Sequence, residues 1–456
     1  MTVHRRVHRK ATRNLLDSLF MSRSRLQQGL YCIGCEEYKD EKELMTEDGE
    51  EDGIKCLCPI HRTKCESRKE RNYFFRLSKY QKEIEQLLEG SIEEGGGAGL
   101  SIMPISRRNE VLGWVHEGLR DFSISRAAVE WGIPIARDPE QTVYVWFDAL
   151  LGYVSALLKI DDEVGGSSLP ERCSNAGWPA SVHIIGKDIL RFHAVYWPAM
   201  LLSAGLDVPQ CVFGHGFLTK DGLKMGKSLG NVLHPDELVN TFGADPVRYY
   251  FLAEMEFGKD GDFSENRFIE KVNASLANDV GNLLNRTLKM FRKNCEGVID
   301  YDISLSFDAD HPIRAICTSA VGDAKEAYES MRFHEACSAA LSISGACNRF
   351  LEQKEPWIKL KNGTDEEKLE AKKDLIAVLE ATRIVAYILW PIVPSLSVKI
   401  LEQLRVLQKL QNDTDQIIPK WEYAVWGGGG LQVGHEVVSK PSPVFMRLEG
   451  TVQAAV

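Results

Sequence analysis

The sequence predicts an α/β region that is followed by an all-α region. Three short apolar runs are bounded by turn residues, as in buried parallel strands: "VYVWF" (143–147), "VHII" (182–185) and "QCVFG" (210–214). From residue 266 onward strand patterns cease, and apolar side chains recur at helical spacing, beginning with Phe268 and Val272. We therefore expect a doubly wound parallel sheet and, after it, a helix bundle.

The order of the strands also predicts where ligands bind. In doubly wound sheets, ligands lie beyond the carboxyl ends of the strands, which here means "WFDALLGY" after the first run and "GKD" after the second. Between the N-terminal part and these strands, the Gly-rich stretch 93–101 is typical of a flexible link.

The composition limits the classes of function. The chain has 456 residues, 44% of them hydrophobic and 26% charged, and no stretch reaches the ~18 consecutive apolar residues that a membrane-spanning helix needs. Its formal charge of -10 argues against a protein that coats DNA through general positive charge. We therefore expect neither a membrane nor DNA as a partner, and any other nucleic acid would have to be recognised by a local surface.

Five of the eleven cysteines crowd into residues 32–65. Two residues separate Cys32 from Cys35 and also Cys58 from His61, which is the spacing at which pairs of zinc ligands leave a tight turn. The polar link between the pairs is typical of a zinc ribbon. We predict a closed, structural Zn²⁺ site with these four ligands, in a reducing compartment. The alternatives are buried thiols, or a ligand set that uses one of the other two cysteines of this stretch.

The first thirty residues are basic. They contain seven Arg or Lys residues and a single acid, Asp17, a pattern typical of organelle transit peptides. A solvated basic tail or a misread segment of the gene is the alternative. We therefore predict a mitochondrial or plastid location, with the cytoplasm as the alternative.

A loop rich in glycine and lysine occupies residues 214–231, "GHGFLTKDGLKMGKSLGN". Lysine is a compact positive charge with three donors, and glycine lets the backbone approach oxygen atoms closely. Lys224 and Lys227 therefore predict a site for a polyphosphate, with a solvated turn as the alternative.

In the predicted bundle, Asn282 and Arg286 are four residues apart and so share one helix face. Trp357 lies next to a proline that ends a helix. Taken alone, such a tryptophan is more often a half-buried core residue than a platform for stacking.

These motifs, in this order, resemble one family. The zinc-ligand pairs, "SRRNEVLGWVHEGLRDFSISR", "WGIPI", "VYVWFDALLGY", "HIIGKDILRFHAVYWPAML", the lysine loop, "ADPVRYYFL" and "EPW" are similar to bacterial and organellar methionyl-tRNA synthetases, over about residues 29–450. The sequence Lys224-Met225-Gly226-Lys227-Ser228 resembles the class I signature Lys-Met-Ser-Lys-Ser, with Gly226 in place of the middle serine. The resemblance implies a methionine-tRNA ligase that uses ATP with Mg²⁺ to form methionyl-adenylate and transfers methionine to tRNA(Met).

The resemblance also implies an architecture and a role for particular residues. The fold would be an incomplete Rossmann-like catalytic domain with an inserted zinc-knuckle connective domain, followed by an anticodon-binding helix bundle. Its implied segments are 1–30 (basic segment), 31–141 (connective domain), 142–213 (second half of the catalytic domain), 214–265 (lysine loop and stem-contact region) and 266–456 (bundle and tail). The implied site residues are Lys224 and Lys227 for catalysis; Gly186, Asp188, Lys224, Lys227 and Ser228 for ATP; Trp146, Ala149, Tyr153, Ile189 and His193 for methionine; and Asn282, Arg286 and Trp357 for the anticodon.

One motif of the family is missing from this sequence. The family begins with a strand and His-Ile-Gly-His at a helix start, and no such sequence precedes Tyr31. The string "HIIG" at 183 precedes Lys187 and belongs to the second half of the sheet. We therefore expect this chain to be truncated and catalytically impaired, and to form methionyl-adenylate very slowly or not at all. The alternative is a non-catalytic fragment that binds tRNA.

Overall fold

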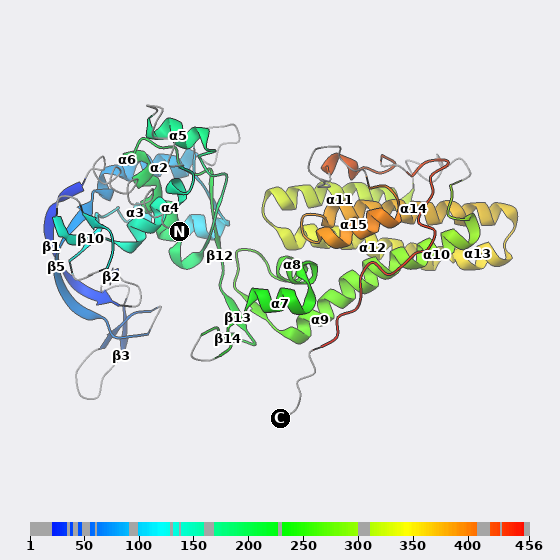
Figure 1. The fold of residues 1–456 in the computed structure, drawn as a ribbon, viewed down its shortest axis with the longest axis horizontal. Helices are drawn as coiled ribbons and strands as arrows, with labels where there is room; N and C mark the ends of the chain where they lie inside the picture. Colours follow the sequence, from blue (N-terminus) through cyan, green and yellow to red (C-terminus); the bar gives the residue numbers. More distant parts are fainter. Residues whose placement is uncertain are drawn as a thin grey trace, which may run out of the picture. The chain divides into compact units, whose positions relative to one another are not determined.

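In a computed structural model, the chain folds into two compact units, Met1–His215 and Gly216–Val456, which we call the sheet unit and the bundle unit (Figure 1). None of the helices in the described part of the chain is both long and apolar enough to cross a membrane. The structure describes residues 21–33, 37–39, 44–47, 55–59, 62–90, 99–127, 131–135, 138–158, 168–226, 230–299, 311–407, 420–428 and 431–450.

The described part of the sheet unit contains four small sheets, with strand orders β2-β1-β5-β7, β3-β4, β8-β10-β9 and β11-β12-β6. Only the last is parallel throughout. The strands are β1 (Met21–Cys32), β2 (Glu37–Lys39), β3 (Met45–Glu47), β4 (Lys55–Leu57), β5 (Glu66–Phe75), β6 (Ser101–Met103), β7 (Phe122–Ser123), β8 (Ser125–Arg126), β9 (Pro134–Ile135), β10 (Asp138–Val143), β11 (His183–Gly186) and β12 (Cys211–His215).

The parallel sheet confirms two predicted strands and adds one. Strands β11 and β12 coincide with "VHII" and "QCVFG", and β12 also pairs with β6, a strand that directly follows the expected flexible link. Each strand buries an apolar residue in one core: Ile102, Ile185 and Val212. The expected connective domain 31–141 is therefore not one separate module, because β6 lies within it and belongs to the parallel sheet.

The prediction of a strand at 143–147 is wrong. Strand β10 ends at Val143 and is antiparallel to β8 and β9, and helix α4 begins at Val145. The apolar run continues as a helical stripe, with Phe147, Leu150, Leu151 and Val154 buried on one face. The run 143–147 includes only the first three residues of this helix, which are too few to show helical spacing.

Strand β1 also corrects a predicted boundary. Residues 21–30, which were assigned to a basic N-terminal segment, pair with β5 in a long antiparallel ladder from Met21↔Phe75 to Tyr31↔Glu66 (Figure 1). The basic side chains suit this position because Arg25 is exposed, lies over the Phe74 ring and pairs with Asp121 at 2.7 Å. Residues 1–20 lie outside the described part of the chain.

The described part of the sheet unit also contains five α-helices. They are α2 (Gln81–Glu89), α3 (Ile105–His116), α4 (Val145–Ser155), α5 (Leu169–Asn175) and α6 (Trp197–Ser203). Between β11 and α6 the chain forms a 3₁₀ turn (Lys187–Ile189) and a short π-helix (Phe192–Tyr196), whose residues are buried throughout.

The bundle unit begins with a small sheet of β13 (Leu218–Lys220), β14 (Leu223–Lys224) and β15 (Gly261–Phe263), and then becomes helical. Beyond β15, the described residues contain no strand, only the isolated bridge between Val298 and Glu436. The helices are α7 (Pro235–Phe242), α8 (Ala244–Ala253), α9 (Glu265–Val272), α10 (Leu283–Cys295), α11 (Pro312–Glu329), α12 (Phe333–Lys354), α13 (Pro356–Asn362), α14 (Asp365–Leu389) and α15 (Pro394–Gln403).

A π-helix, η8 (Asn273–Asn282), joins α9 to α10 without a break, so these elements form one long first helix of the bundle (Figure 1). Helix α12 packs against α11 and α14, and the core extends without interruption from Leu238 to Val444. Because α7 and α8 share this core, the predicted boundary at residue 266 does not separate two packing units. Residues 442–448, which we call the strap, run back along the first helix.

Candidate functional site

A polar pair surrounded by aromatic rings joins α4 to the segment after β11. The Tyr153 hydroxyl lies 2.9 Å from His193 Nε2, and His193 Nδ1 lies 2.9 Å from the carbonyl oxygen of Ile189. Because a carbonyl oxygen can only accept, Nδ1 carries the hydrogen, and the neutral imidazole accepts from the Tyr153 hydroxyl at Nε2. The bond to Ile189 therefore fixes the tautomer and the orientation of the ring.

Burial keeps the titratable groups of this pair uncharged near pH 7. It lowers the pKa of His193, although the bond to Ile189 acts in the opposite direction, and it raises the pKa of Tyr153. A second histidine, His183, lies at the start of β11, where burial and the neighbouring His193 lower its pKa to about 4. The site therefore presents hydrogen-bonding groups without net charge.

Aromatic rings surround this pair. Trp146 stacks on Phe192 with 4.6 Å between ring centroids, and the Tyr153 ring lies 4.3 Å from that of His183. Trp178 and Trp197 lie beyond them, with ring centroids 6.0 Å apart. Aromatic walls with one polar anchor suit an uncharged, polarisable group such as a thioether.

Of the five residues predicted to bind methionine, hydrogen bonds join Tyr153, Ile189 and His193, and Trp146 stacks on Phe192, the residue before His193. The fifth, Ala149, is exposed one turn before Tyr153 on the same helix. Tyr153 is itself 38% exposed, so the polar pair is reached from the surface.

Gly186 and Asp188, both predicted to bind ATP, lie at the carboxyl end of β11. A side-chain carbon at position 186 would be only 2.5 Å from Oδ1 of Asp188. Glycine therefore leaves room for this carboxylate to lie over the end of the strand. Asp188 is exposed and is available to a ligand.

The predicted lysine loop, residues 214–231, contains the β13–β14 hairpin of the bundle unit. Lys224 is exposed on β14 and lies opposite Thr219 in the ladder. Asn231 closes the base of the loop: its Oδ1 accepts from the Gly226 N–H at 2.9 Å, and its Nδ2 donates to the Lys224 carbonyl at 3.2 Å. The other two predicted residues, Lys227 and Ser228, lie outside the described residues.

Asn282 and Arg286 lie one turn apart where η8 becomes α10, as their spacing predicts. Asn282 is exposed. Arg286 is partly buried, and its Nη2 donates to Oδ1 of Asn348 on α12 at 2.6 Å. The helix bundle thus holds this guanidinium in place at the edge of its core.

The third predicted anticodon residue, Trp357, stands at the start of α13 with 42% of its surface exposed, so it is not a core residue. Glu370 on α14 accepts from Lys354 at 3.0 Å and from Lys359 at 2.9 Å, and so fastens both sides of the turn that carries this indole. The ring is presented to solvent on a braced turn, as a stacking platform requires.

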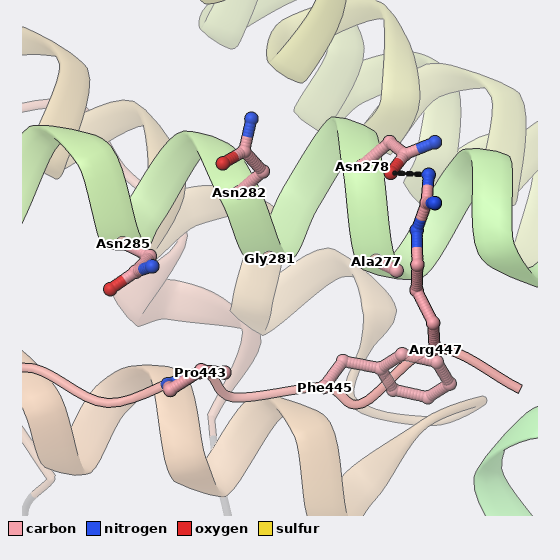
Figure 2. A pocket seen from close by; sticks show the side chains of 8 residues that line it. All are labelled: Ala277, Asn278, Gly281, Asn282, Asn285, Pro443, Phe445 and Arg447. Carbon is pink, nitrogen blue, oxygen red and sulfur yellow. Dashed lines mark hydrogen bonds between the residues drawn. The ribbon is translucent and has the colours of Figure 1, made fainter.

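A cavity of about 200 Å³ lies between the first bundle helix and the strap. In Figure 2 the Asn285 side chain points toward Pro443 of the strap, and Arg447 reaches Asn278, to which it donates at 2.8 Å. Asn282 also borders this cavity. The lining residues are Ala277, Asn278, Gly281, Asn282, Asn285, Pro443, Phe445 and Arg447.

Three cysteines gather at the end of the β1–β5 ladder. Cys32 and Cys58 are fully buried, and Cys65 lies with them. Burial and these two thiols raise the pKa of Cys65. After Cys58 the chain reverses tightly, because the Arg62 N–H donates to the Cys58 carbonyl at 2.7 Å. Two predicted zinc ligands therefore adjoin each other.

The other two predicted zinc ligands, Cys35 and His61, lie outside the described ranges. Within those ranges, no group of three or more His, Cys, Asp or Glu side chains is arranged to hold a metal ion. The zinc site stays a prediction.

Sequence reasoning missed several residues of these sites. Phe192 could have been found as an aromatic residue next to the predicted ligand His193, and His183 as a ring in the motif that contains Gly186. Asn231 could have been found as the asparagine that ends the lysine loop. Nothing local marks Asn348, which is 62 positions from its partner Arg286.

Two family models match the chain. The model of class I tRNA synthetases (M) matches residues 19–288, more than half of the chain, and that of the anticodon binding domain of methionyl tRNA ligase matches residues 307–440.

Individual proteins are similar over nearly the whole chain. It is 50% identical over 422 residues to the chloroplastic/mitochondrial methionine–tRNA ligase of Arabidopsis thaliana, a match that covers 92% of this chain and 64% of that protein. It is 48% identical over 429 residues to the methionine–tRNA ligase of a Nostoc species, covering 93% of this chain and 76% of that protein. The chain thus spans somewhat less than two thirds of the length of the plant protein.

Solved structures are similar as well. The methionyl-tRNA synthetase of Mycobacterium tuberculosis in complex with methionyl-adenylate superposes with a TM-score of 0.79 at 31% identity, over 96% of this chain and 81% of that one. The free form of the same enzyme gives a TM-score of 0.77 at 29% identity.

Proposed function

Because the chain belongs to the family of class I methionyl-tRNA synthetases, we propose that it acts as a methionine-tRNA ligase, in the ATP-dependent activation of methionine and its transfer to tRNA(Met). The observation that carries this proposal is the neutral aromatic site around Tyr153 and His193. An uncharged hydrogen-bonding pair within aromatic walls favours a thioether side chain over charged or strongly polar side chains.

Each residue of this site has a separate part in the proposal. Trp146 and Ile189 provide apolar walls for the methionine side chain, with Ala149 leaving space at the open side. His193, held by the Ile189 carbonyl, orients the Tyr153 hydroxyl toward its Nε2. A fixed hydrogen-bonding pair of this kind positions a ligand without having to reorganise on binding.

ATP is proposed to bind at the carboxyl end of β11 and at the lysine loop. Asp188 would accept from the ribose hydroxyls, while Lys224, Lys227 and Ser228 would meet the phosphates together with Mg²⁺. When the methionine carboxylate attacks the α-phosphate, pyrophosphate leaves, and the two lysines would stabilise the charge that grows on it.

The bundle is proposed to read the CAU anticodon. Exposed Asn282 and the held guanidinium of Arg286 offer donors and acceptors to base edges, and Trp357 offers a face for stacking. Unpaired bases of an anticodon loop present both features to a protein.

We also propose a structural Zn²⁺ held by Cys32, Cys35, Cys58 and His61. The support is the adjacency of the Cys32 and Cys58 thiols and the backbone bond from Arg62 to Cys58. A second candidate ligand follows each of these two cysteines after two intervening residues. A bound Zn²⁺ would contribute folding energy to this hairpin and no chemistry to the reaction, because the four ligands close the site.

Methionine-dependent exchange of labelled pyrophosphate into ATP tests the ligase proposal. We expect slow exchange by the 456-residue chain that requires methionine and is abolished by Lys224→Ala, while Lys220→Ala on the neighbouring strand β13 serves as the matched control. Exchange that does not need methionine, or that is equally fast in Lys224→Ala, would contradict it.

The same experiment separates the alternative function, a non-catalytic tRNA-binding protein. No exchange, together with anticodon-dependent binding of tRNA(Met), supports that alternative, which the intact bundle surface favours. If there is neither exchange nor selective binding, both functions are wrong.

Trp357→Ala should weaken binding of tRNA(Met) by about one to two factors of ten, because stacking on a base is worth ~1–3 kcal/mol. Fluorescence anisotropy at one fixed salt concentration measures this, since affinity for RNA depends strongly on salt. Trp131→Ala is the matched control, because this indole is 86% exposed in the sheet unit. An equal affinity of the parent chain for a tRNA with another anticodon would refute selection.

We propose an organellar location for the chain. The plant relative is called chloroplastic/mitochondrial, and the basic residues 1–20 precede β1. A fusion of these residues to a fluorescent protein that stays in the cytosol would contradict this.

A further inference from the structure

The guanidinium of Arg286 depends on one neighbour for its orientation. Its Nη2 donates to Oδ1 of Asn348 at 2.6 Å, a short charge-assisted bond, while its Nε is buried and makes no hydrogen bond within the described part of the chain. Without Asn348 this side chain would lose the side-chain hydrogen bond that, among the described residues, determines which of its donors face outward.

The other end of the Asn348 amide contacts the same helix seven residues, or about two turns, earlier. Its Nδ2 donates to the carbonyl oxygen of Asp279 at 3.5 Å, within the π-helical stretch η8. The two partners assign the amide without ambiguity, because a guanidinium only donates and a carbonyl only accepts. The bond to Arg286 is the shorter and stronger of the two.

These two bonds enclose the residue proposed to read the anticodon. Asn282 lies between Asp279 and Arg286 in the sequence, at the point where η8 changes to α10. Short π-helical stretches depart from regular geometry and frequently mark functional sites. A side chain from α12 thus holds the first helix on both sides of Asn282.

We propose that Asn348 is a positioning residue for RNA recognition: its amide oxygen sets the direction of the Arg286 guanidinium, and its amide nitrogen steadies the π-helical turn that presents Asn282. This inference rests on the proposed reading of the anticodon by the bundle. Its physical basis is preorganisation, because donors that are already oriented lose less entropy when a base binds.

The test compares the binding of two RNA hairpins to the full chain, one with a CAU loop and one with a GAU loop. The readout is the ratio of the two dissociation constants at one salt concentration, because a general loss of RNA binding leaves this ratio unchanged. Asn348→Ala should lower the preference for CAU about tenfold, the lower end of what a hydrogen bond to a charged group contributes.

A conservative variant separates orientation from packing. Asn348→Asp keeps an acceptor for Arg286 and loses the donor to Asp279. We expect it to keep the preference for CAU to within about threefold of the parent, while its added negative charge weakens binding of both hairpins alike. Gln353→Ala, exposed on the same helix, is the matched control and should leave both affinities unchanged. If Asn348→Ala does not fold, the aspartate variant carries the test.

Arg286→Ala separates a failure of the positioning role of Asn348 from a failure of the proposed anticodon contact. If it abolishes the preference and Asn348→Ala does not, the positioning role is wrong and the proposed function stands. If Asn348→Asp loses the preference as fully as the alanine variant does, the acceptor role is wrong. If Arg286→Ala leaves the preference intact, the anticodon assignment fails, and this inference fails with it.

Discussion

The bundle unit buries its apolar side chains in one continuous core, whereas the sheet unit divides them between a main core and a small cluster of cysteines. In the bundle, this core extends from Leu238 to Val444. Among the described residues, the cysteine cluster consists of Cys32, Cys58 and Cys65, with two leucines packed against it. A cluster of this size contributes little burial toward the entropy of ordering the chain around it, and a bound metal ion would add stability there.

The difference shows how each region supports its proposed site. The bundle residues proposed to bind RNA lie on the surface of a core that is complete without a ligand. The segment around Cys32, Cys58 and Cys65 would gain order from the ion that we propose it binds. A destabilising substitution near the cysteines should therefore unfold only that segment. A destabilising substitution in the core of the bundle should affect the whole unit.

The largest effect should follow from loss of the metal. Cys58→Ser should abolish tight binding of one Zn²⁺ per chain and unfold the hairpin, because binding of a structural Zn²⁺ is worth roughly 10 kcal/mol or more in small zinc domains. Elemental analysis and amide hydrogen exchange over residues 31–66 measure both results. The bundle should keep its exchange protection.

Two other cysteines sharpen this test. Cys56→Ser should keep the metal, because Cys56 is half-exposed outside the cluster. Cys65→Ser decides between the two ligand sets: retained metal supports His61 as the fourth ligand, and lost metal supports Cys65 instead. Less than one equivalent of zinc in the parent chain would refute the site.

In the bundle, the largest effect should come from a buried ion pair within α14. Arg383 Nη2 lies 2.7 Å from Glu380 Oε1, both side chains are fully buried, and the same oxygen accepts from the Gly427 N–H at 2.8 Å. Glu380→Ala leaves the Arg383 charge unpaired and should destabilise the bundle by about 3–5 kcal/mol. Urea unfolding followed by helical circular dichroism measures this.

The double variant Glu380→Met with Arg383→Met tests the cause. Removing both charges should restore most of the stability, because the penalty arises from the unpaired ion and not from lost volume. A loss of less than 1 kcal/mol in Glu380→Ala would mean that water reaches Arg383. Glu352→Ala, exposed on α12, is the control.

A substitution of Asp374 should have a smaller effect on the stability of the bundle, and should raise it. Burial raises the pKa of this carboxyl to about 6, with the nearby Glu370 acting in the same direction and Lys354 and Lys359 against it. Between pH 4 and 6 the unfolded chain has lost this proton and the folded chain has not, so the stability contribution of Asp374 falls as the pH rises through this window.

Asp374→Asn should therefore stabilise the bundle by roughly 1–3 kcal/mol at pH 7 and by almost nothing below about pH 4. Urea midpoints at the two pH values give the comparison. A variant less stable than the parent at pH 7 would show that the ionised carboxylate is satisfied in the fold.

The smallest effect is expected where the strap is attached. Gln403 donates to the Ser442 carbonyl at 2.6 Å and accepts from the Ser442 N–H at 3.2 Å. Gln403→Ala should lower the free energy of unfolding of the bundle by about 1 kcal/mol and speed amide exchange in residues 442–448. Unchanged exchange there would show that the buried Val444 alone holds the strap.

The sequence allowed good predictions where local pattern determines structure. Buried parallel strands such as β11 and β12 are continuous apolar runs, and the bundle helices have clear stripes, so both were found. Helix α4 was missed because five consecutive apolar residues are too few to tell the start of a helix from a buried strand. Strand β6 was missed because it has only three residues and begins where the Gly-rich stretch ends.

Residues of the candidate sites were likewise predicted where local spacing determines their position and missed where tertiary contacts do. Spacing placed Asn282 and Arg286 on one face, because four residues make about one helical turn. Asn348 and Cys65 could not be assigned from spacing, because tertiary folding brings them to partners distant in the sequence. The bond between Arg286 and Asn348 spans 62 positions, and no periodicity extends that far.

The strap sets the order in which the bundle can be completed. Asn273 exchanges two hydrogen bonds with the backbone of Leu448, across 175 positions of the chain. Contacts of such long sequence separation form late, because they close the largest loops. During synthesis the first helix can fold and pack while its strap-facing side stays uncovered, until residue 448 has left the ribosome. The face that carries Asn278 and Asn285 is thus the last part of the bundle to be covered.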